Sequence, residues 1–169
     1  VISVDGPQCT CGRKGCFEVY SSATGLVRMT KEALAANPES AMKDEERISA
    51  RTAFNYMRAG DATAKQVVDD YIKYLADARL INMVYPKGEE FPKKPSKIMM
   101  HNSNLMYSIY PVKVEEQDVL DTFFANTMWK DHKVNKGDKN ISFMVDEVMP
   151  FKICPEGTKI KNNPGVTYV

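Results

Sequence analysis

Apolar positions recur with a helical period through the first half of the chain. Over residues 19–36 they fall on one side of a helix, and an Asn-Pro pair ends the run. A shorter helix is expected over residues 48–60, where Gly60 stops it. Asp61 is placed to cap a third helix, in which packing explains the apolar stripe better than a ligand site does. The stripe consists of Ala64, Val67, Val68, Tyr71, Ile72 and Leu75.

The second half mixes strand-like and helical patterns. A strand is expected near Ile98 and Met99, and residues 105–114 and 141–153 alternate like two further strands. Residues 115–132 have helical spacing, and residues 135–140 form a turn. The apolar side of that helix is expected to contain Val119, Leu120, Phe123, Phe124 and Met128, with Trp129 closing it. This half is therefore predicted to be α+β.

A charged, proline-containing segment separates the two patterns. We expect residues 1–86 to form one region, residues 87–96 a linker, and residues 97–169 a second region of unassigned identity. At 169 residues, 43% of them hydrophobic, the chain can bury one sizeable core or two small ones. The sequence thus favours two compact parts.

Charge and hydropathy exclude several classes of partner. The 23 basic and 22 acidic residues leave a net charge of +1, which provides no broad field for nucleic acid or an anionic membrane. No apolar run approaches the roughly 18 residues that cross a bilayer. We expect a soluble, cytoplasmic protein without a nucleic-acid or membrane partner.

Three cysteines crowd into the run CTCGRKGC, and a glutamate follows closely. Cys9, Cys11 and Cys16 are spaced C-x-C-x4-C between glycines, so a tight turn can direct three thiolates at one tetrahedral zinc ion. Reduced surface thiols or a disulfide framework remain open alternatives. A bridge between Cys9 and Cys11 would close a small strained ring, and four cysteines in the chain are few for a disulfide scaffold.

The run CTCGRKGCFEVYSSATG, residues 9–25, resembles the zinc-loop signature of the ROK family of bacterial sugar kinases and sugar-sensing repressors, which includes many glucokinases. The similarity continues to about residue 85. The resemblance implies a fragment of an actin-like, ribonuclease H-like sugar kinase fold, an α/β family context, with an unassigned α+β second half.

The resemblance also implies the roles of four residues. Cys9, Cys11 and Cys16 would hold a structural zinc together with a histidine that precedes Val1. Glu18 would contact sugar hydroxyls, and its alternative is a solvated glutamate favoured at a helix start. The catalytic aspartate and the phosphate-binding strand of such kinases would also lie upstream, so we expect a fragment, a separately numbered portion or a fusion.

Two departures from the family pattern concern the helix end and the nucleotide site. About two residues fewer than usual lie within residues 75–86, so either the helix breaks near residues 77–79 or the sequence omits residues. His101-Asn102-Ser103 stands where the family has a Gly-Gly phosphate turn, and no ATP-binding residue is therefore assigned.

Three further side chains could bind the metal in place of the missing fourth ligand. They are Cys154, His101 and His132, and for each a local structural role is the favoured interpretation. Cys154 is the most attractive of them because a fourth thiolate would complete an all-sulfur shell.

The leading functional hypothesis is a portion of a ROK-like hexose kinase that is not competent on its own. ATP and Mg²⁺ would serve only the complete kinase, and the expected partners are a hexose and, in a homodimer, a second copy. The alternative is a non-catalytic, zinc-stabilised sugar-sensing or protein-interaction module. A third hypothesis is a purely structural zinc domain with a partner-binding second half.

Overall fold

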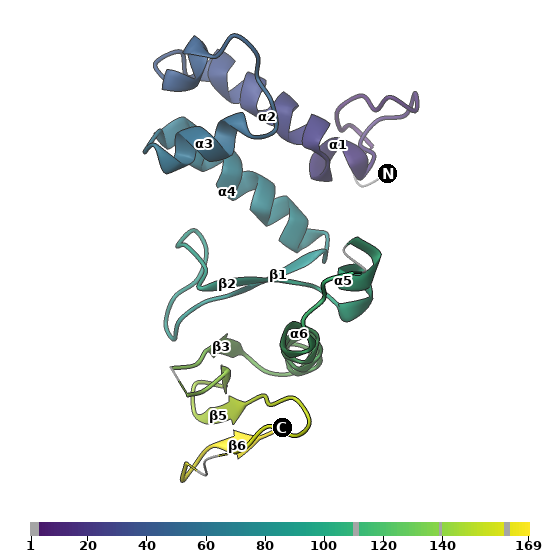
Figure 1. The fold of residues 1–169 in the computed structure, drawn as a ribbon. Helices are drawn as coiled ribbons and strands as arrows, with labels where there is room; N and C mark the ends of the chain where they lie inside the picture. The colour runs from purple at the N-terminus through teal and green to yellow at the C-terminus, as the bar shows by residue number, and fades with distance from the viewer. Residues whose placement is uncertain (1–3, 110–111, 139, 161–162) are drawn as a thin grey trace. The chain divides into compact units, whose positions relative to one another are not determined.

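The computed structural model describes residues 4–109, 112–138, 140–160 and 163–169, and the chain forms two compact units. The first unit is Val1–Asp77 and the second is Ala78–Val169 (Figure 1). The expected boundary near Pro86 lies inside the second unit, where residues 87–96 are part of the connection between two paired strands. The α+β class is confirmed.

The first unit is built from helices. They are α1 (Glu18–Ser21), α2 (Ala23–Ala36), the 3-10 turn η1 (Ala41–Asp44), α3 (Thr52–Arg58) and α4 (Ala62–Asp77). The apolar stripe predicted for α4 is confirmed, since Ala64, Val67 and Val68 are buried. They share a core with Leu26 of α2 and with Met42 of η1, whose side chain is fully buried although the residues that follow it in sequence are charged.

The helix predicted over residues 19–36 is divided at Ser22. Ser22 has an extended backbone, with ψ of 166°, and its hydroxyl accepts a hydrogen bond from Gly25 N at 3.0 Å. It therefore caps α2 in the usual manner of serine, and α1 becomes a separate turn. Gly25 lies so close to α1 that a Cβ at this position would be 2.5 Å from the carbonyl oxygen of Val19. Close approach of the two helices, rather than a local weakening of one, explains this glycine.

Asp61 joins α4 to the preceding loop. Its Oδ1 accepts from Ala64 N at 2.7 Å, which confirms the predicted cap, and its Oδ2 accepts from Ser40 Oγ and Ala41 N at 2.8 Å each. Partial burial alone would raise the pKa of Asp61, but these hydrogen bonds outweigh it and lower the pKa. At its other end α4 stops at Asp77, and Arg79 has a φ of 55°, so the helix ends where the first of the two alternatives expected a break.

The second unit combines a hairpin, two helices and a small sheet. The hairpin strands β1 (Ile81–Val84) and β2 (Lys97–Met100) are antiparallel, which confirms the strand near Ile98. Helices α5 (Ser103–Ile109) and α6 (Glu116–Met128) follow. The sheet has the order β3-β4-β5-β6, with only the last pair parallel. Its strands are β3 (Val134–Lys136), β4 (Phe143–Val145), β5 (Met149–Lys152) and β6 (Thr167–Tyr168).

The strand predicted over residues 105–114 was wrong, because this segment begins as helix α5. Asn102 Oδ1 accepts a hydrogen bond from Leu105 N at 3.0 Å, which is the geometry of a helix cap. Local capping thus prevails over the alternation of side chains. Residues 110–111, within the predicted strand, lie outside the described residues.

The strand predicted over residues 141–153 is in fact a hairpin of β4 and β5. Asp146 and Glu147 turn the chain with φ of 50° and 62°. Asp146 stabilises the turn, since its carboxylate accepts from Lys133 N at 2.9 Å and lies 2.6 Å from His132 Nδ1. The pKa of Asp146 is lowered, first by the Lys133 backbone donor and then by His132.

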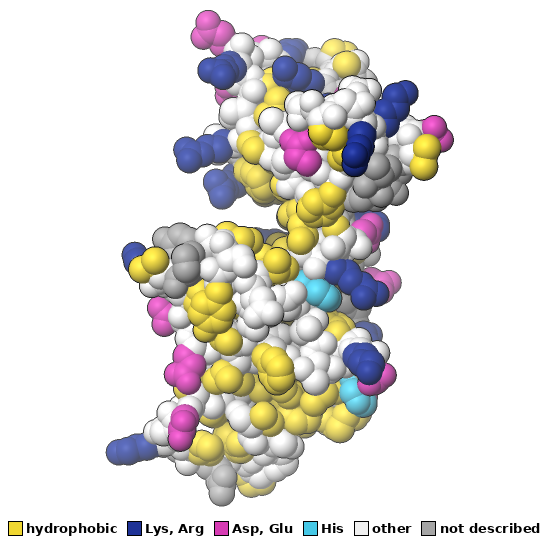
Figure 2. Space-filling view, turned by 90° about the vertical axis from the view of Figure 1, so that its right-hand side faces the viewer, with side chains coloured by type: hydrophobic (Ala, Val, Ile, Leu, Met, Phe, Trp, Pro, Cys, Tyr) yellow, Lys and Arg dark blue, Asp and Glu magenta, His cyan; other side chains and the backbone are white. Residues whose placement is uncertain are grey.

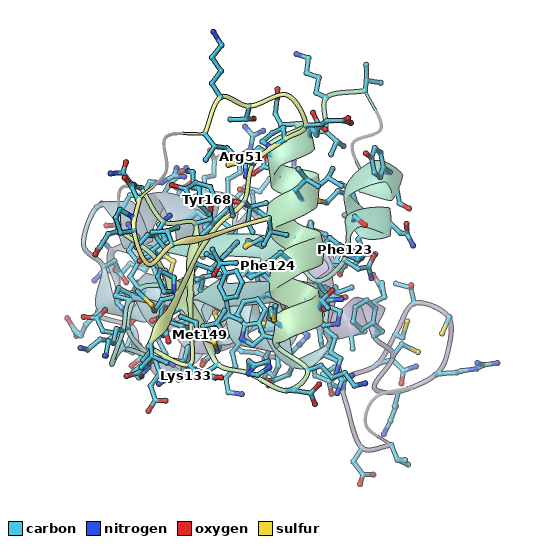
Figure 3. All side chains as sticks on the ribbon, turned by 90° about the horizontal axis from the view of Figure 1, so that it is seen from below. Arg51, Phe123, Phe124, Lys133, Met149 and Tyr168 are labelled. Atoms are coloured by element: carbon cyan, nitrogen blue, oxygen red, sulfur yellow. The ribbon has the colours of Figure 1, made fainter. Side chains whose placement is uncertain are left out.

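The buried face of α6 differs from the predicted one at Phe123. Phe124 is buried, with 7% of its surface exposed, and its ring packs against Phe143 and Phe151. Phe123, in contrast, is 65% exposed. Figure 3 shows the two rings leaving α6 on different sides. Polar Asp121 occupies the buried face instead, because Lys97 Nζ at 2.8 Å and Gln117 Nε2 at 2.7 Å satisfy its carboxylate. Trp129 packs against the core as predicted.

The two units differ in the side chains that their surfaces expose. On the face drawn in Figure 2, hydrophobic side chains gather over the second unit. Exposed apolar residues there include Phe123, Val148 and Tyr107. Across the described ranges, no helix has both the length and the apolar composition that crossing a membrane requires.

Gly25→Ala should destabilise the first unit although alanine is the better helix former. The added methyl must displace the Val19 carbonyl, so we expect the free energy of unfolding to fall by about 1–3 kcal/mol. Urea denaturation followed by far-UV circular dichroism measures the change. Lys31→Ala, an alanine at an exposed position of the same helix, is the control and should stay within about 0.5 kcal/mol. A stabilised Gly25→Ala protein would contradict the close approach.

Phe124→Ala and Phe123→Ala test the buried face of α6. We expect a loss of about 3–5 kcal/mol at Phe124, because truncation leaves a cavity beside Phe143 and Phe151. The exposed neighbour should change stability by only about 0.5 kcal/mol. Trp129, the single tryptophan, packs on this core, so its fluorescence during denaturation reports the transition. Equal losses at both positions would show that the face is assigned wrongly.

Candidate functional site

A short hairpin carries the three clustered cysteines. Gln8 and Lys14 form an antiparallel bridge, and Cys9 N donates to Arg13 O at 2.8 Å. Gly12 N donates to Cys9 O at 3.0 Å and has a φ of +85°, a backbone conformation that glycine adopts readily. The glycine spacing in the sequence therefore serves to reverse the chain inside the cysteine run.

The hairpin and the start of α1 bring the predicted metal ligands together. The sulfurs of Cys9, Cys11 and Cys16 all lie within 4.8 Å of one another, and those of Cys11 and Cys16 are 3.6 Å apart. Ligands around a tetrahedral zinc with bonds of about 2.3 Å are separated by about 3.8 Å. The donor set therefore fits zinc in both chemistry and spacing, and these three residues could hold a metal.

The thiols differ in acidity. A hydrogen bond from the Arg13 backbone, then contacts with Cys9 and Cys16, lower the pKa of Cys11. The hydrogen bond with Cys11, followed by burial, raises the pKa of Cys16 to about 11. The contact between these two sulfurs, 3.6 Å apart, therefore favours the thiolate of Cys11 over that of Cys16. The thiolate is the form of cysteine that binds a metal ion.

Glu18 opens α1 directly beside this cluster. Its Oε2 accepts from Cys9 Sγ at 3.4 Å, and its Oε1 accepts from Thr24 Oγ1 at 3.0 Å. The carboxylate is otherwise exposed to solvent. It therefore lies between the sulfurs and the start of α2, with capacity to accept further hydrogen bonds from a ligand.

Two long side chains fix the single turn α1. Tyr71 Oη of α4 donates to Ser21 O at 3.0 Å, and Arg28 Nη2 of α2 donates to Val19 O at 3.2 Å. Both acceptors are carbonyls at the end of a helix, which lack partners within it. The short helix that carries Glu18 is thus tied to the two longest helices of its unit.

Ser22 and Thr24 are polar neighbours of Glu18 that sequence reasoning did not single out. Their hydroxyls are 2.7 Å apart, and Thr24 contacts the carboxylate. A serine before a helical run is a recognisable cap signal, so Ser22 could have been predicted. The role of Thr24 could not, because it depends on the break between α1 and α2.

Thr24 also borders a groove between α2 and the loop before α3. The groove measures about 740 Å³ and has both charged and apolar walls. It is lined by Ala23, Thr24, Val27, Lys31, Glu45, Glu46, Arg47, Ile48, Ser49 and Ala50. Small-molecule sites commonly have volumes of about 300–1,000 Å³. A hollow of adequate size is thus next to the residue that holds Glu18.

The other candidate metal ligands lie in the second unit. The two histidines among them have local hydrogen-bond partners. His101 Nδ1 is 3.0 Å from Asn82 Oδ1, and His132 contacts Asp146. Cys154 is a free, half-buried cysteine beyond β5. Within the described residues, groups of three or more potential ligands consist of Cys9, Cys11 and Cys16 alone.

About half of the chain is similar to known proteins. A glucokinase of Halalkalibacterium halodurans is 37% identical over 93 residues, which cover 52% of this chain and 28% of that protein. A glucokinase of Thermotoga maritima is 33% identical over 89 residues, covering 46% of this chain and 26% of that protein. The matched segment thus spans about a quarter of the length of these relatives. No solved structure matches.

The family comparison gives the residues that it matches. The sequence model of the ROK family, which is of the actin-like sugar kinase type, matches residues 1–87. This range contains the cysteine hairpin, Glu18 and all the helices of the first unit. Because the match extends over more than half of the 169 residues, the chain belongs to the ROK family.

Proposed function

We propose that this chain supplies a structural zinc loop and a sugar-contacting carboxylate to a glucokinase-like, ATP-dependent hexose kinase. The observation that carries the proposal is the position of Glu18, whose carboxylate lies 3.4 Å from the sulfur of Cys9 in a three-sulfur cluster. The two glucokinases to which about half of the chain is similar support the choice of a hexose. Both relatives extend well beyond the matched segment, so the activity would belong to the longer protein.

The proposed roles divide between the metal and the glutamate. The thiolates of Cys9, Cys11 and Cys16 would hold zinc, whose contribution is to fix the hairpin rather than to act on a substrate. Glu18 would accept charge-assisted hydrogen bonds from sugar hydroxyls and orient the ring. A bound sugar would shield this exposed carboxylate from water, and analogues that lack those hydroxyls would leave it unpaired, which gives specificity. ATP and Mg²⁺ would be needed only by the complete kinase.

The second candidate is a sugar-sensing or interaction module without kinase activity. Residues 101–103, which stand in place of a glycine phosphate turn, lead into α5, and His101 is engaged by Asn82. This observation favours a chain that binds sugar without a nucleotide. Under either candidate, homodimerisation and a cytoplasmic location stay predictions.

Replacement of any clustered cysteine should release the metal. Protein purified with zinc supplied should contain about one ion per chain, and Cys9→Ser, Cys11→Ser and Cys16→Ser should each contain almost none, since serine is a poor zinc ligand. Elemental analysis by mass spectrometry gives the ratio. Cys154→Ser, a change at the remaining free cysteine, is the control and should keep its zinc. Zinc-free wild-type protein, or an equal loss in the control, would sink the assignment.

Glu18→Gln should weaken glucose binding by about tenfold or more, because the amide removes the charge that strengthens hydrogen bonds from hydroxyls. Isothermal titration calorimetry of the zinc-loaded chain measures the affinity. Glu39→Gln, at an exposed carboxylate of the same unit, is the matched control.

The same titration, repeated with ATP and Mg²⁺ on a protein that includes the rest of the kinase, separates the two candidates. The kinase proposal expects the nucleotide to alter the glucose signal once the rest of the protein is present, whereas a signal indifferent to ATP favours the sensor. An affinity for glucose that Glu18→Gln leaves unchanged would exclude the sugar-binding role in both.

A further inference from the structure

Three consecutive hydrogen bonds run from the backbone of α2 to the Glu18 carboxylate. Gly25 N lies 3.0 Å from Ser22 Oγ, Ser22 Oγ lies 2.7 Å from Thr24 Oγ1, and Thr24 Oγ1 lies 3.0 Å from Glu18 Oε1. All of these groups belong to the turn that separates α1 from α2. The row of contacts ends on one oxygen of the carboxylate.

The donor and acceptor properties of these groups fix the direction of each hydrogen bond in the row. A backbone N–H can only donate, so Ser22 Oγ accepts from Gly25. An ionised carboxylate can only accept, so the hydroxyl proton of Thr24 is committed to Glu18. The proton between the two hydroxyls must therefore come from Ser22. Each hydroxyl donates once and accepts once, which leaves a single consistent arrangement.

The carboxylate needs such a support, because it stands on a helix of only four residues and is exposed to solvent. A free glutamate side chain samples many rotamers, and ordering it on binding costs about 1.5–2 kcal/mol. Thr24 holds Oε1 with or without zinc, whereas Cys9 Sγ can donate to Oε2 only while the thiol keeps its proton. A carboxylate offers about four acceptor positions, so at least two of them stay available to ligand hydroxyls.

We propose that Thr24, fixed by Ser22, is a positioning residue that holds the Glu18 carboxylate in the orientation in which it meets a sugar. The inference rests on the proposed role of Glu18 as a sugar contact. Thr24 acts through the glutamate, and its hydroxyl is the group that matters. Its methyl group and β-branched shape are expected to be dispensable.

Two substitutions separate the hydroxyl from the shape of the side chain. Thr24→Val keeps the β-branched shape and removes the donor, whereas Thr24→Ser keeps the donor and removes the methyl. In calorimetric titrations of the zinc-loaded full chain with glucose, Thr24→Val should bind about fivefold more weakly, and Thr24→Ser should stay within about twofold of wild type. In a Glu18→Gln background, Thr24→Val should have no further effect.

A second readout does not need sugar. The two Hγ protons of Glu18, assigned by their loss in Glu18→Ala, should have distinct chemical shifts in wild type and in Thr24→Ser. They should converge in Thr24→Val, where the side chain is released to average over rotamers.

The outcomes of the two readouts are distinguishable. Thr24→Val that retains both distinct resonances and full glucose affinity overturns the inference, as does an equal loss in Thr24→Ser. If wild-type protein fails to bind glucose, the proposed function falls, and the resonances alone decide whether Thr24 orients Glu18.

Discussion

The hairpin that gathers three sulfurs is the constraint on which the site of this chain depends. Hydrogen bonds from Cys9 N to Arg13 O and from Gly15 N to Pro7 O, both 2.8 Å, fold the cysteine run back on itself. The turn is possible because Gly12 and Gly15 adopt positive φ. Without this reversal the sulfurs of Cys9 and Cys16 would be separated by the length of an extended loop. The backbone conformation of the hairpin therefore determines whether the three sulfurs can bind one metal ion.

The single turn α1 connects this hairpin to the helical core. It is too short to be stable by itself, because a helix needs many more residues to offset the cost of its first turn. Tyr71 and Arg28 satisfy its terminal carbonyls, and Gly25 allows α2 to approach it closely. The position of Glu18 is thus decided by the packing of the surrounding helices, which explains why a functional carboxylate can stand on so small an element.

The second unit shows how buried polar groups can replace the expected apolar ones. Asp121 lies on the buried side of α6 and is paired with Lys97 and Gln117, and the latter also donates to Ile153 O at 3.3 Å. Such a network joins the hairpin, the helix and the end of β5 through satisfied hydrogen bonds. The ROK match stops at residue 87, so it covers only residues 78–87 of this unit.

The sequence by itself determined the helical first half, the Asp61 cap, the α+β class and the relationship to the ROK family, and it left the break after Asp77 as one of two alternatives. These features depend on local signals, namely the spacing of apolar residues, cap residues and the cysteine run, that act within a few positions of one another. Only the tertiary structure decided that residues 103–109 are helical, that Phe123 faces solvent and that Thr24 reaches Glu18. Each of these depends on partners from another element or on a break within a periodic run, and a one-dimensional pattern contains no information about such contacts.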